Sequence, residues 1–238
     1  MTGHTSQPLF LFLLLVFTTT GCTPLPKVVP QKPPTVRSVS EMRNQIRLDS
    51  NQAVIPLKKV IPELLTDWKY DSYENFTHQI LYKNPVAYLR KEPAMALEKI
   101  NKELNAIGLG ILLFDAYRPY RVTRKMWAIV PDERYAANPA KGSGHNRGAA
   151  VDLTLYELKT GKMLEMGTDF DHFSDTAHHD FTGLPQQTIQ NRQLLKRTMM
   201  KHGFIPLSTE WWHYSWPDAA KRFPIMDLSF QQMKNLTR

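Results

Sequence analysis

The first 45 residues of the chain have a composition that does not suit a packed domain. Pro8 to Phe17 is an unbroken apolar run, long enough for the core of a secretory signal but short for a membrane span. Thr23 to Pro34 contains five prolines, which favours an extended tether. The remaining residues, 46–238, suffice for one domain with a sizeable core, and two domains would fit poorly.

The only cysteine, Cys22, follows a run of small residues. A lone cysteine excludes an internal disulfide, so in an exported protein it needs another role. The segment TTTGC at 18–22 resembles the lipobox of bacterial lipoproteins, whose cysteine carries the lipid. The resemblance implies a signal peptide over 1–21, a lipidated Cys22 and a Pro-rich tether over 22–45. It also implies export to the cell envelope, with a membrane anchor facing the periplasm or the cell surface.

The match to a lipobox is imperfect in two respects. The first seven residues contain no Lys or Arg, and a Thr occupies the position at which lipoboxes usually have Leu. A cleaved signal peptide without a lipid and an uncleaved anchor are therefore the alternatives.

The chain carries a formal net charge of +8, which favours contact with an anionic polymer such as nucleic acid, lipid headgroups or an acidic cell wall. Its Lys and Arg residues are scattered in short pairs such as Lys58-Lys59 and form no long basic block. This pattern is typical of a solvated surface, so we expect no nucleic-acid partner.

Helix and strand patterns follow one another without a repeat or a regular strand–helix–strand succession, which predicts the α+β class. The clearest helix, 93–107, has Pro in its first turn, apolar residues at helical spacing and Gly108 as its stop. The segment 149–155 alternates, so Val151 should face the core and Asp152 the opposite side. Further helices are predicted over about 119–129 and 187–202, and further strands over 111–114 and 210–216.

Two segments carry residues that commonly bind metal ions. In SGHNRGAAVD at 143–152 a glycine-containing turn separates His145 from Asp152, and in EWWH at 210–213 His213 follows Glu210. Two imidazoles and a carboxylate form a common catalytic zinc set, and a further Glu beside the bound water would be the general base. Because residues three apart face opposite sides of a strand, the second segment must bend to serve one metal. Spacing alone leaves structural, hydrogen-bonded histidines as the alternative.

Five ordered segments resemble the D-alanyl-D-alanine dipeptidase family, which includes the vancomycin-resistance dipeptidases. They are S-x-H-x-x-G-x-A-x-D at 143–152, EWWH at 210–213, NFT at 75–77, DAYRP at 115–119 and MGTDFD at 166–171. The resemblance implies a zinc D-Ala-D-Ala peptidase (hedgehog-like) fold over 46–238, a single α+β domain with an antiparallel sheet flanked by helices. It also implies one zinc ion per chain, held by His145, Asp152 and His213.

The same resemblance implies roles for residues around the metal. Glu210 is the expected catalytic base, and Arg118 the residue that steadies the developing oxyanion. Ser143 either binds the substrate carboxylate or caps the local turn. Asp171 either holds the free amino group of a dipeptide or caps a turn. The histidines at 172, 178 and 179 receive no metal role.

These assignments predict a zinc metallopeptidase that hydrolyses D-alanyl-D-alanine, or a related small D-amino-acid dipeptide, during peptidoglycan turnover in the envelope. Resistance members of the family resemble soluble cytoplasmic enzymes, so the export signal sets this chain apart. A D,D-carboxypeptidase or endopeptidase acting on peptidoglycan stem peptides is the first alternative. A lipoprotein that binds wall peptides without cleaving them is the second, although such a protein has no need of Glu210 as a base.

Overall fold

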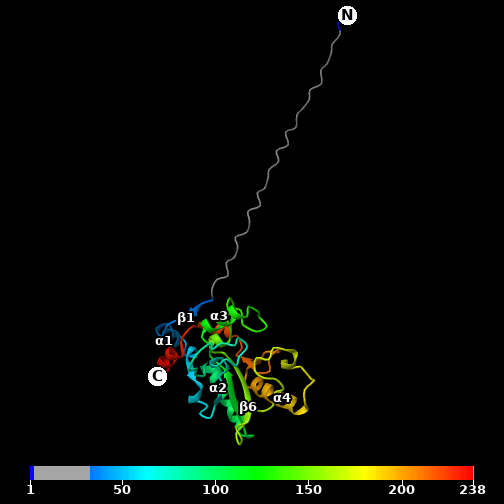
Figure 1. Ribbon diagram of the computed structural model, residues 1–238. Coiled ribbons are helices and arrows are strands. Elements are labelled where there is room, and N and C mark those ends of the chain that lie inside the picture. The colour runs from blue at the N-terminus through cyan, green and yellow to red at the C-terminus, as the bar shows by residue number, and fades with distance from the viewer. Residues whose placement is uncertain (3–32, 238) are drawn as a thin grey trace. The chain divides into compact units, whose positions relative to one another are not determined.

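The computed structural model describes residues 1–2 and 33–237. Cys22, nearly all of the predicted signal peptide and the first part of the tether lie outside the described residues. Residues 33–237 contain a five-stranded sheet, two two-stranded sheets and the helices packed around them (Figure 1). This architecture confirms the predicted α+β class. Within the described residues, no helix combines the length and the apolar character needed to cross a membrane.

The central sheet has the strand order β3–β5–β6–β8–β7. The edge strand β3 is parallel to β5, and each of the other neighbouring pairs is antiparallel, so the predicted antiparallel sheet carries one parallel edge. The two longest strands, β5 and β6, lie side by side and position the site described below. The strands are β3 (Leu65–Thr66), β5 (Leu109–Asp115), β6 (Ala150–Glu157), β7 (Ile205–Pro206) and β8 (His213–Ser215).

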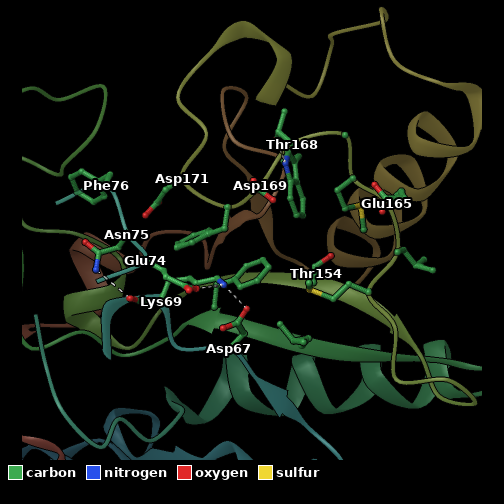
Figure 2. Close-up of a pocket in the computed structure, with 18 of the residues that line it drawn as sticks. Asp67, Lys69, Glu74, Asn75, Phe76, Thr154, Glu165, Thr168, Asp169 and Asp171 are labelled. Atoms are coloured by element: carbon green, nitrogen blue, oxygen red, sulfur yellow. Dashed lines mark hydrogen bonds and ion pairs between the residues drawn. The ribbon is translucent and has the colours of Figure 1, made fainter. Parts of the chain in front are cut away.

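The helix α2 (Lys91–Asn105) covers one face of this sheet and lies beneath the strands in Figure 2. Its Leu97 belongs to the same buried cluster as Val151, while Asp152 lines a cavity. The alternation predicted for β6 is therefore confirmed, because Val151 packs into the core and Asp152 faces away from it. Ile107, the last residue of the helix predicted over 93–107, is 60% exposed, because α2 ends at Asn105.

The other predicted elements appear close to their expected bounds, with one exception. The strand predicted over 210–216 is shorter, because residues 210–212 form a turn before β8. The helices predicted over 119–129 and 187–202 are α3 (Tyr120–Ile129) and α4 (Gln186–Lys201). The smaller elements are β2 (Val54–Pro56), β4 (Tyr88–Arg90), α5 (Ala219–Arg222) and the 3-10 turns η1 (Ser50–Gln52), η2 (Leu57–Lys59), η3 (Lys69–Asp71), η4 (His145–Arg147) and η5 (Asp175–Ala177).

Folded structure begins ahead of the domain boundary that we placed at residue 46. The strand β1 (Thr35–Val36) pairs in parallel with β9 (Ile225–Met226), and α1 (Val39–Leu48) packs against the C-terminal helix α6 (Phe230–Leu236). Met42 of α1 is fully buried in the cluster that these elements form. Both elements come directly after the Pro-rich stretch, so the last part of the predicted tether belongs to the domain.

Arg90 is fully buried and joins three segments that are distant in sequence. Its guanidinium donates to the carbonyl oxygens of Gln52, Arg147 and Pro224 at 2.6, 2.8 and 3.3 Å. Arg147 lies in the turn that begins with the first predicted metal ligand. Arg90 therefore holds part of the site in place as well as the N-terminal and C-terminal segments.

Replacing Arg90 with Met should lower the free energy of unfolding by about 3–5 kcal/mol, because it leaves one buried and two partly buried carbonyl groups without their donor. Urea unfolding followed by circular dichroism measures this difference. Lys91→Met, at the adjacent exposed position, is the matched control and should change the free energy by less than about 0.5 kcal/mol. Equal effects of the two substitutions would contradict the role of Arg90.

Candidate active site

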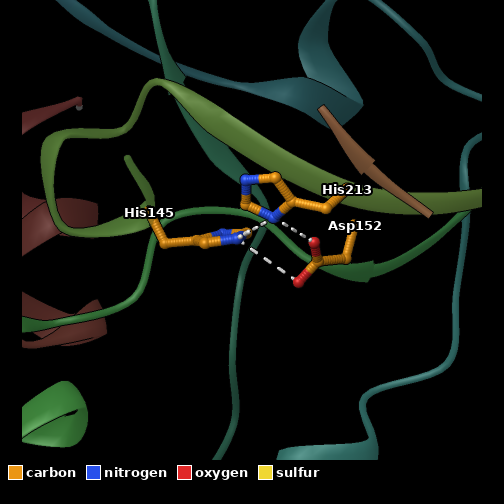
Figure 3. A group of neighbouring side chains, drawn as sticks. All are labelled: His145, Asp152 and His213. Carbon is orange, nitrogen blue, oxygen red and sulfur yellow. Dashed lines mark hydrogen bonds and ion pairs between the residues drawn. The ribbon is translucent and has the colours of Figure 1, made fainter. Parts of the chain in front are cut away.

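His145, Asp152 and His213 bring their side chains together (Figure 3). His145 begins η4, Asp152 lies in β6, and His213 opens β8 directly opposite Asp152 in the strand register. Nδ1 of His213 lies 2.8 Å from Asp152 Oδ1, and Nε2 of His145 lies 3.3 Å from both Asp152 Oδ2 and His213 Nδ1. Among the described residues, this is the group that could hold a metal ion.

Neighbouring groups orient both imidazoles. His145 Nδ1 lies 2.8 Å from the carbonyl oxygen of Ala116, which can only accept, so Nδ1 carries the proton and Nε2 presents its lone pair to the cluster. Nε2 of His213 lies 3.0 Å from Ser215 Oγ. Burial alone would lower the pKa of His213, but the hydrogen bond to Asp152 and the charge of that carboxylate raise it. The pKa of Asp152 is lowered, because the two histidines outweigh the effect of burial.

Gly148 allows the chain to turn between His145 and β6. It follows η4 with a φ of 65°, a left-handed conformation that favours glycine. A Cβ at this position would lie 3.3 Å from Met226 Cε and 3.4 Å from the backbone N of Arg90, so close packing also disfavours a side chain. The glycine-containing turn inferred from the sequence therefore has a structural cause.

Glu210 lies beside the cluster, although it precedes strand β8. The chain turns between Glu210 and His213, whose backbone N–H donates to the Glu210 carbonyl oxygen at 3.3 Å. This turn is the bend that the three-residue spacing required, and it lets both side chains line one cavity. Burial raises the pKa of Glu210, an effect that the charge of His213 opposes and that of Asp152 reinforces. A raised pKa suits a carboxylate that must accept a proton near neutral pH.

Arg118 reaches the cluster from the segment that follows β5. Its Nη2 and Nε atoms lie 2.6 and 2.7 Å from Asp115 Oδ2, and Nη2 lies 3.8 Å from Asp152 Oδ2. The hydroxyl of Tyr82 donates to the other oxygen of Asp115 at 3.1 Å. The guanidinium carbon also lies 4.9 Å from the centre of the Tyr70 ring. These contacts fix a buried positive charge beside the metal-binding group.

A β-bulge in β5 decides the position of Asp115. Leu113 pairs with Leu153, but Asp115 pairs with Asp152, so two steps along β5 match one step along β6. Strict alternation would put Asp115 on the same face of the sheet as Leu113. The bulge turns Asp115 to the face that carries Asp152, where it can bind Arg118.

Ser143 and Asp171 both line the cavity at the cluster. Ser143 Oγ accepts a hydrogen bond from the backbone N–H of His145 at 3.0 Å, which is the turn-capping contact that the sequence left as one alternative. The hydroxyl of Tyr70 lies 3.2 and 2.9 Å from the two carboxylate oxygens of Asp171. Burial raises the pKa of Asp171 well above its usual range. Asp171 is thus a partly buried carboxylate held toward the cavity by Tyr70.

The cavity that these residues line has a volume of about 220 Å³. Tyr135 and Phe173 form part of its wall, with ring centroids 4.7 Å apart in an edge-to-face contact. Arg118 supplies positive charge, and Asp171 and Glu210 supply carboxylates. The cavity therefore suits a small molecule with a charged group at each end.

Comparison with known proteins identifies the family. Residues 50–234 match peptidase family M15, described as D-ala-D-ala dipeptidase. The chain belongs to this family. A D-alanyl-D-alanine dipeptidase of Escherichia coli (strain K12) is 34% identical over 173 residues, which cover 73% of this chain and 89% of that protein. A D-alanyl-D-alanine dipeptidase of Enterococcus faecalis (strain ATCC 700802 / V583) is 33% identical over 184 residues, covering 67% of this chain and 91% of its own length.

One solved structure, that of the LdcB LD-carboxypeptidase, is 19% identical and covers 66% of this chain and 74% of its own, with a TM-score of 0.38. Membership of the D-Ala-D-Ala dipeptidase family confirms the resemblance seen in the five sequence segments and makes this chain a peptidase. All five segments lie within the part that matches the family.

The sequence patterns did not predict site roles for three residues, Asp115, Tyr70 and Tyr82. Asp115 was visible as the first residue of the DAYRP segment, three positions before Arg118, but its orientation depends on the bulge. Tyr70 and Tyr82 lie in the segment before β4, and no local pattern connects them with carboxylates at 171 and 115. Their roles follow only from the contacts that the fold creates.

His179 gives the domain a pH-dependent stability. Burial, and then the positive charges of Lys196 and Arg192, lower its pKa from 6.5 to about 4. As the pH falls below about 6.5 the unfolded chain binds the proton first, so the folded state loses stability between pH 6.5 and pH 4. Because the ring is partly exposed to solvent, we expect a loss of about 1 kcal/mol at pH 5.

Thermal unfolding of the wild type and of His179→Gln at pH 7 and pH 5 measures this contribution. The variant should lose less stability on acidification than the wild type, because Gln does not titrate. His172→Gln, at an exposed position nearby, is the control and should follow the wild type. The same acid sensitivity in the wild type and His179→Gln would refute the assignment.

Proposed function

We propose that this chain is a zinc-dependent dipeptidase that hydrolyses D-alanyl-D-alanine, or a closely related D-amino-acid dipeptide, in the bacterial cell envelope. One observation supports the proposal most strongly. A metal-capable His145–Asp152–His213 group shares a cavity of about 220 Å³ with Glu210 and Arg118, in a chain of the D-Ala-D-Ala dipeptidase family.

The donor set fits zinc. Two imidazole nitrogens and one carboxylate oxygen are typical ligands of catalytic zinc sites. Tetrahedral ligand bonds of about 2.0–2.1 Å place donor atoms about 3.3 Å apart. His145 Nε2 and His213 Nδ1 lie 3.3 Å apart, which matches this spacing, and each of them lies 3.3 Å or less from one of the two oxygens of Asp152. One donor atom from each of the three residues lies within 4.8 Å of the other two, so the carboxylate needs only a rotation to present a single oxygen to the ion. We assign one zinc ion per chain to these three ligands.

The remaining side chains supply the parts of a peptide hydrolysis. When bound, zinc lowers the pKa of water and polarises a carbonyl oxygen. Glu210, whose pKa burial raises, is placed to take a proton from the attacking water and to pass it to the leaving amine. Arg118 keeps its charge because Asp115 and Asp152 lie beside it, and it donates to the oxyanion that forms on the scissile carbonyl.

The ends of a dipeptide have counterparts in the cavity. Asp171, held by Tyr70, can bind the free amino group. The positive charge of that amino group favours ionisation of the Asp171 carboxyl group, although burial raises its pKa. Ser143 can donate its hydroxyl hydrogen to the substrate carboxylate while its oxygen accepts from His145 N–H. A small cavity with a carboxylate at the amino end favours a dipeptide over a longer chain.

The test is an assay of the zinc-loaded chain against D-alanyl-D-alanine, L-alanyl-L-alanine and a pentapeptide stem that ends in D-alanyl-D-alanine. We expect cleavage of the D,D-dipeptide alone, and its loss when a chelator removes the metal. Cleavage of the stem instead would make the chain a D,D-carboxypeptidase. Bound zinc without any cleavage would leave a protein that only binds wall peptides.

The location in the envelope rests on the sequence before residue 33. The apolar run and TTTGC ending in Cys22 support export and a lipid anchor that holds the enzyme at the membrane, facing the periplasm or the cell surface. There the enzyme would act on dipeptide released during peptidoglycan turnover. Mass spectrometry of the mature N-terminus should find a lipidated Cys22, and an intact Met1 would exclude this processing.

A further inference from the structure

A second and larger cavity lies next to the catalytic cavity (Figure 2). It is a groove of about 1180 Å³ between the loop 161–171 and the segment 67–78, and Asp171 lines both cavities. Leu112 of β5 and Thr154 of β6 form its floor and are direct partners in the strand register. Thr154 lies two residues after Asp152 and so faces the same side of the sheet. The groove is thus continuous with the sheet face that carries the metal-binding group.

The floor of the groove contains a polar atom that lacks a protein partner. Thr154 is 1% exposed, and its hydroxyl forms no hydrogen bond with any residue among those that the structure describes. Figure 2 shows this side chain rising from the strand into the groove. A buried hydroxyl without a partner costs free energy, so a ligand that hydrogen-bonds to it would be stabilised there.

The walls combine carboxylates with apolar rings. Asp67, Glu74, Glu165 and Asp169 line the groove, although the whole chain carries a formal net charge of +8. Lys69 lies 3.0 Å from Asp67 and 3.4 Å from Glu74, so that pair is partly neutralised. Glu165 and Asp169 are exposed at the rim, where Lys162 also lines the groove, and within residues 33–237 their side chains form neither an ion pair nor a hydrogen bond. The apolar part of the lining includes Phe76, Leu112, Phe114, Leu164 and Trp211.

We propose that this groove is a second ligand site, for a short peptide that carries a lysine-type side chain. The alkyl part of such a side chain can lie on the half-buried Phe76 and Leu164, and its ammonium group can reach the carboxylates of Glu165 and Asp169. The hydroxyl of Thr154 then binds a peptide group of the ligand. An anionic ligand would meet these carboxylates unfavourably, and a purely apolar one would leave the buried hydroxyl of Thr154 without a partner. The site does not depend on which dipeptide the catalytic cavity accepts.

Isothermal titration of the full-length chain with N-acetyl-Gly-Lys-Gly-amide tests the site. Both ends of this probe are blocked, so it offers no free amino terminus to Asp171 and no carboxylate to Ser143. We expect saturable binding that weakens as salt increases, and loss of binding when the lysine is ε-acetylated. No saturable binding, or equal binding of the acetylated probe, would overturn the proposal.

Substitutions locate the binding. The double variant Glu165→Gln/Asp169→Asn should weaken binding about five- to tenfold, because it removes the two unpaired charges. Thr154→Val keeps the shape of the side chain and should weaken binding about threefold or more. Asp175→Asn is the control, since its side chain is 93% exposed and lies outside the groove. Equal affinities in the double variant and this control would also overturn the proposal.

Discussion

Replacing Glu210 with Gln is expected to lower kcat/KM for D-alanyl-D-alanine by about 10²- to 10⁴-fold while the bound zinc is retained. Gln occupies nearly the same space but accepts no proton, so the attacking water loses its base. Metal should stay because the donor atoms come from His145, Asp152 and His213. Steady-state kinetics and metal analysis of the same preparation measure both quantities.

The control for this substitution is Glu157→Gln, at the exposed end of β6. It removes the same charge away from the cavity and should leave kcat/KM within about twofold of the wild type. A Glu210→Gln variant that keeps more than about a tenth of the activity would exclude Glu210 as the base. Loss of zinc together with activity would instead make Glu210 part of the metal site.

Arg118→Lys should lower kcat/KM by about 10²- to 10³-fold, although it preserves the positive charge. The guanidinium donates to Asp115 through Nε and Nη2 and lies 3.8 Å from Asp152 Oδ2. A lysine ammonium can replace one of these contacts but cannot also present a donor to the oxyanion in the same fixed orientation. We expect the loss to appear mainly as a lower kcat rather than a higher KM, because the oxyanion forms only as the transition state is reached.

Arg121→Lys provides the control on the same segment of chain. Arg121 binds Asp227 at 2.8 Å on the surface and should tolerate the change with little effect on kcat. Arg118 is buried whereas Arg121 is half-exposed, so the Arg118 substitution could also destabilise the fold. Thermal unfolding of both variants shows whether a loss of kcat is accompanied by a loss of stability. An effect of Arg118→Lys on KM alone would assign the residue to substrate binding rather than to the oxyanion.

Much of the fold could be predicted from local patterns. The helices α2, α3 and α4 and the alternation in β6 follow from apolar spacing, first-turn prolines and glycine stops, which act within a few residues of each other. The same patterns failed at α1 and β1. β1 has only two residues, and both elements follow a Pro-rich stretch and contact β9 and α6 at the opposite end of the chain.

In the candidate site, too, some features follow from neighbouring residues in the sequence and others only from contacts between distant segments. Local sequence was enough to predict the donor types, the glycine turn that separates His145 from Asp152, and the need for a bend between Glu210 and His213. Only the tertiary structure placed His213 opposite Asp152, because strand register depends on packing between distant segments. The bulge that turns Asp115 toward Arg118 and the hydrogen bond from Tyr70 to Asp171 likewise exist only in the folded chain, since no local rule brings these side chains together.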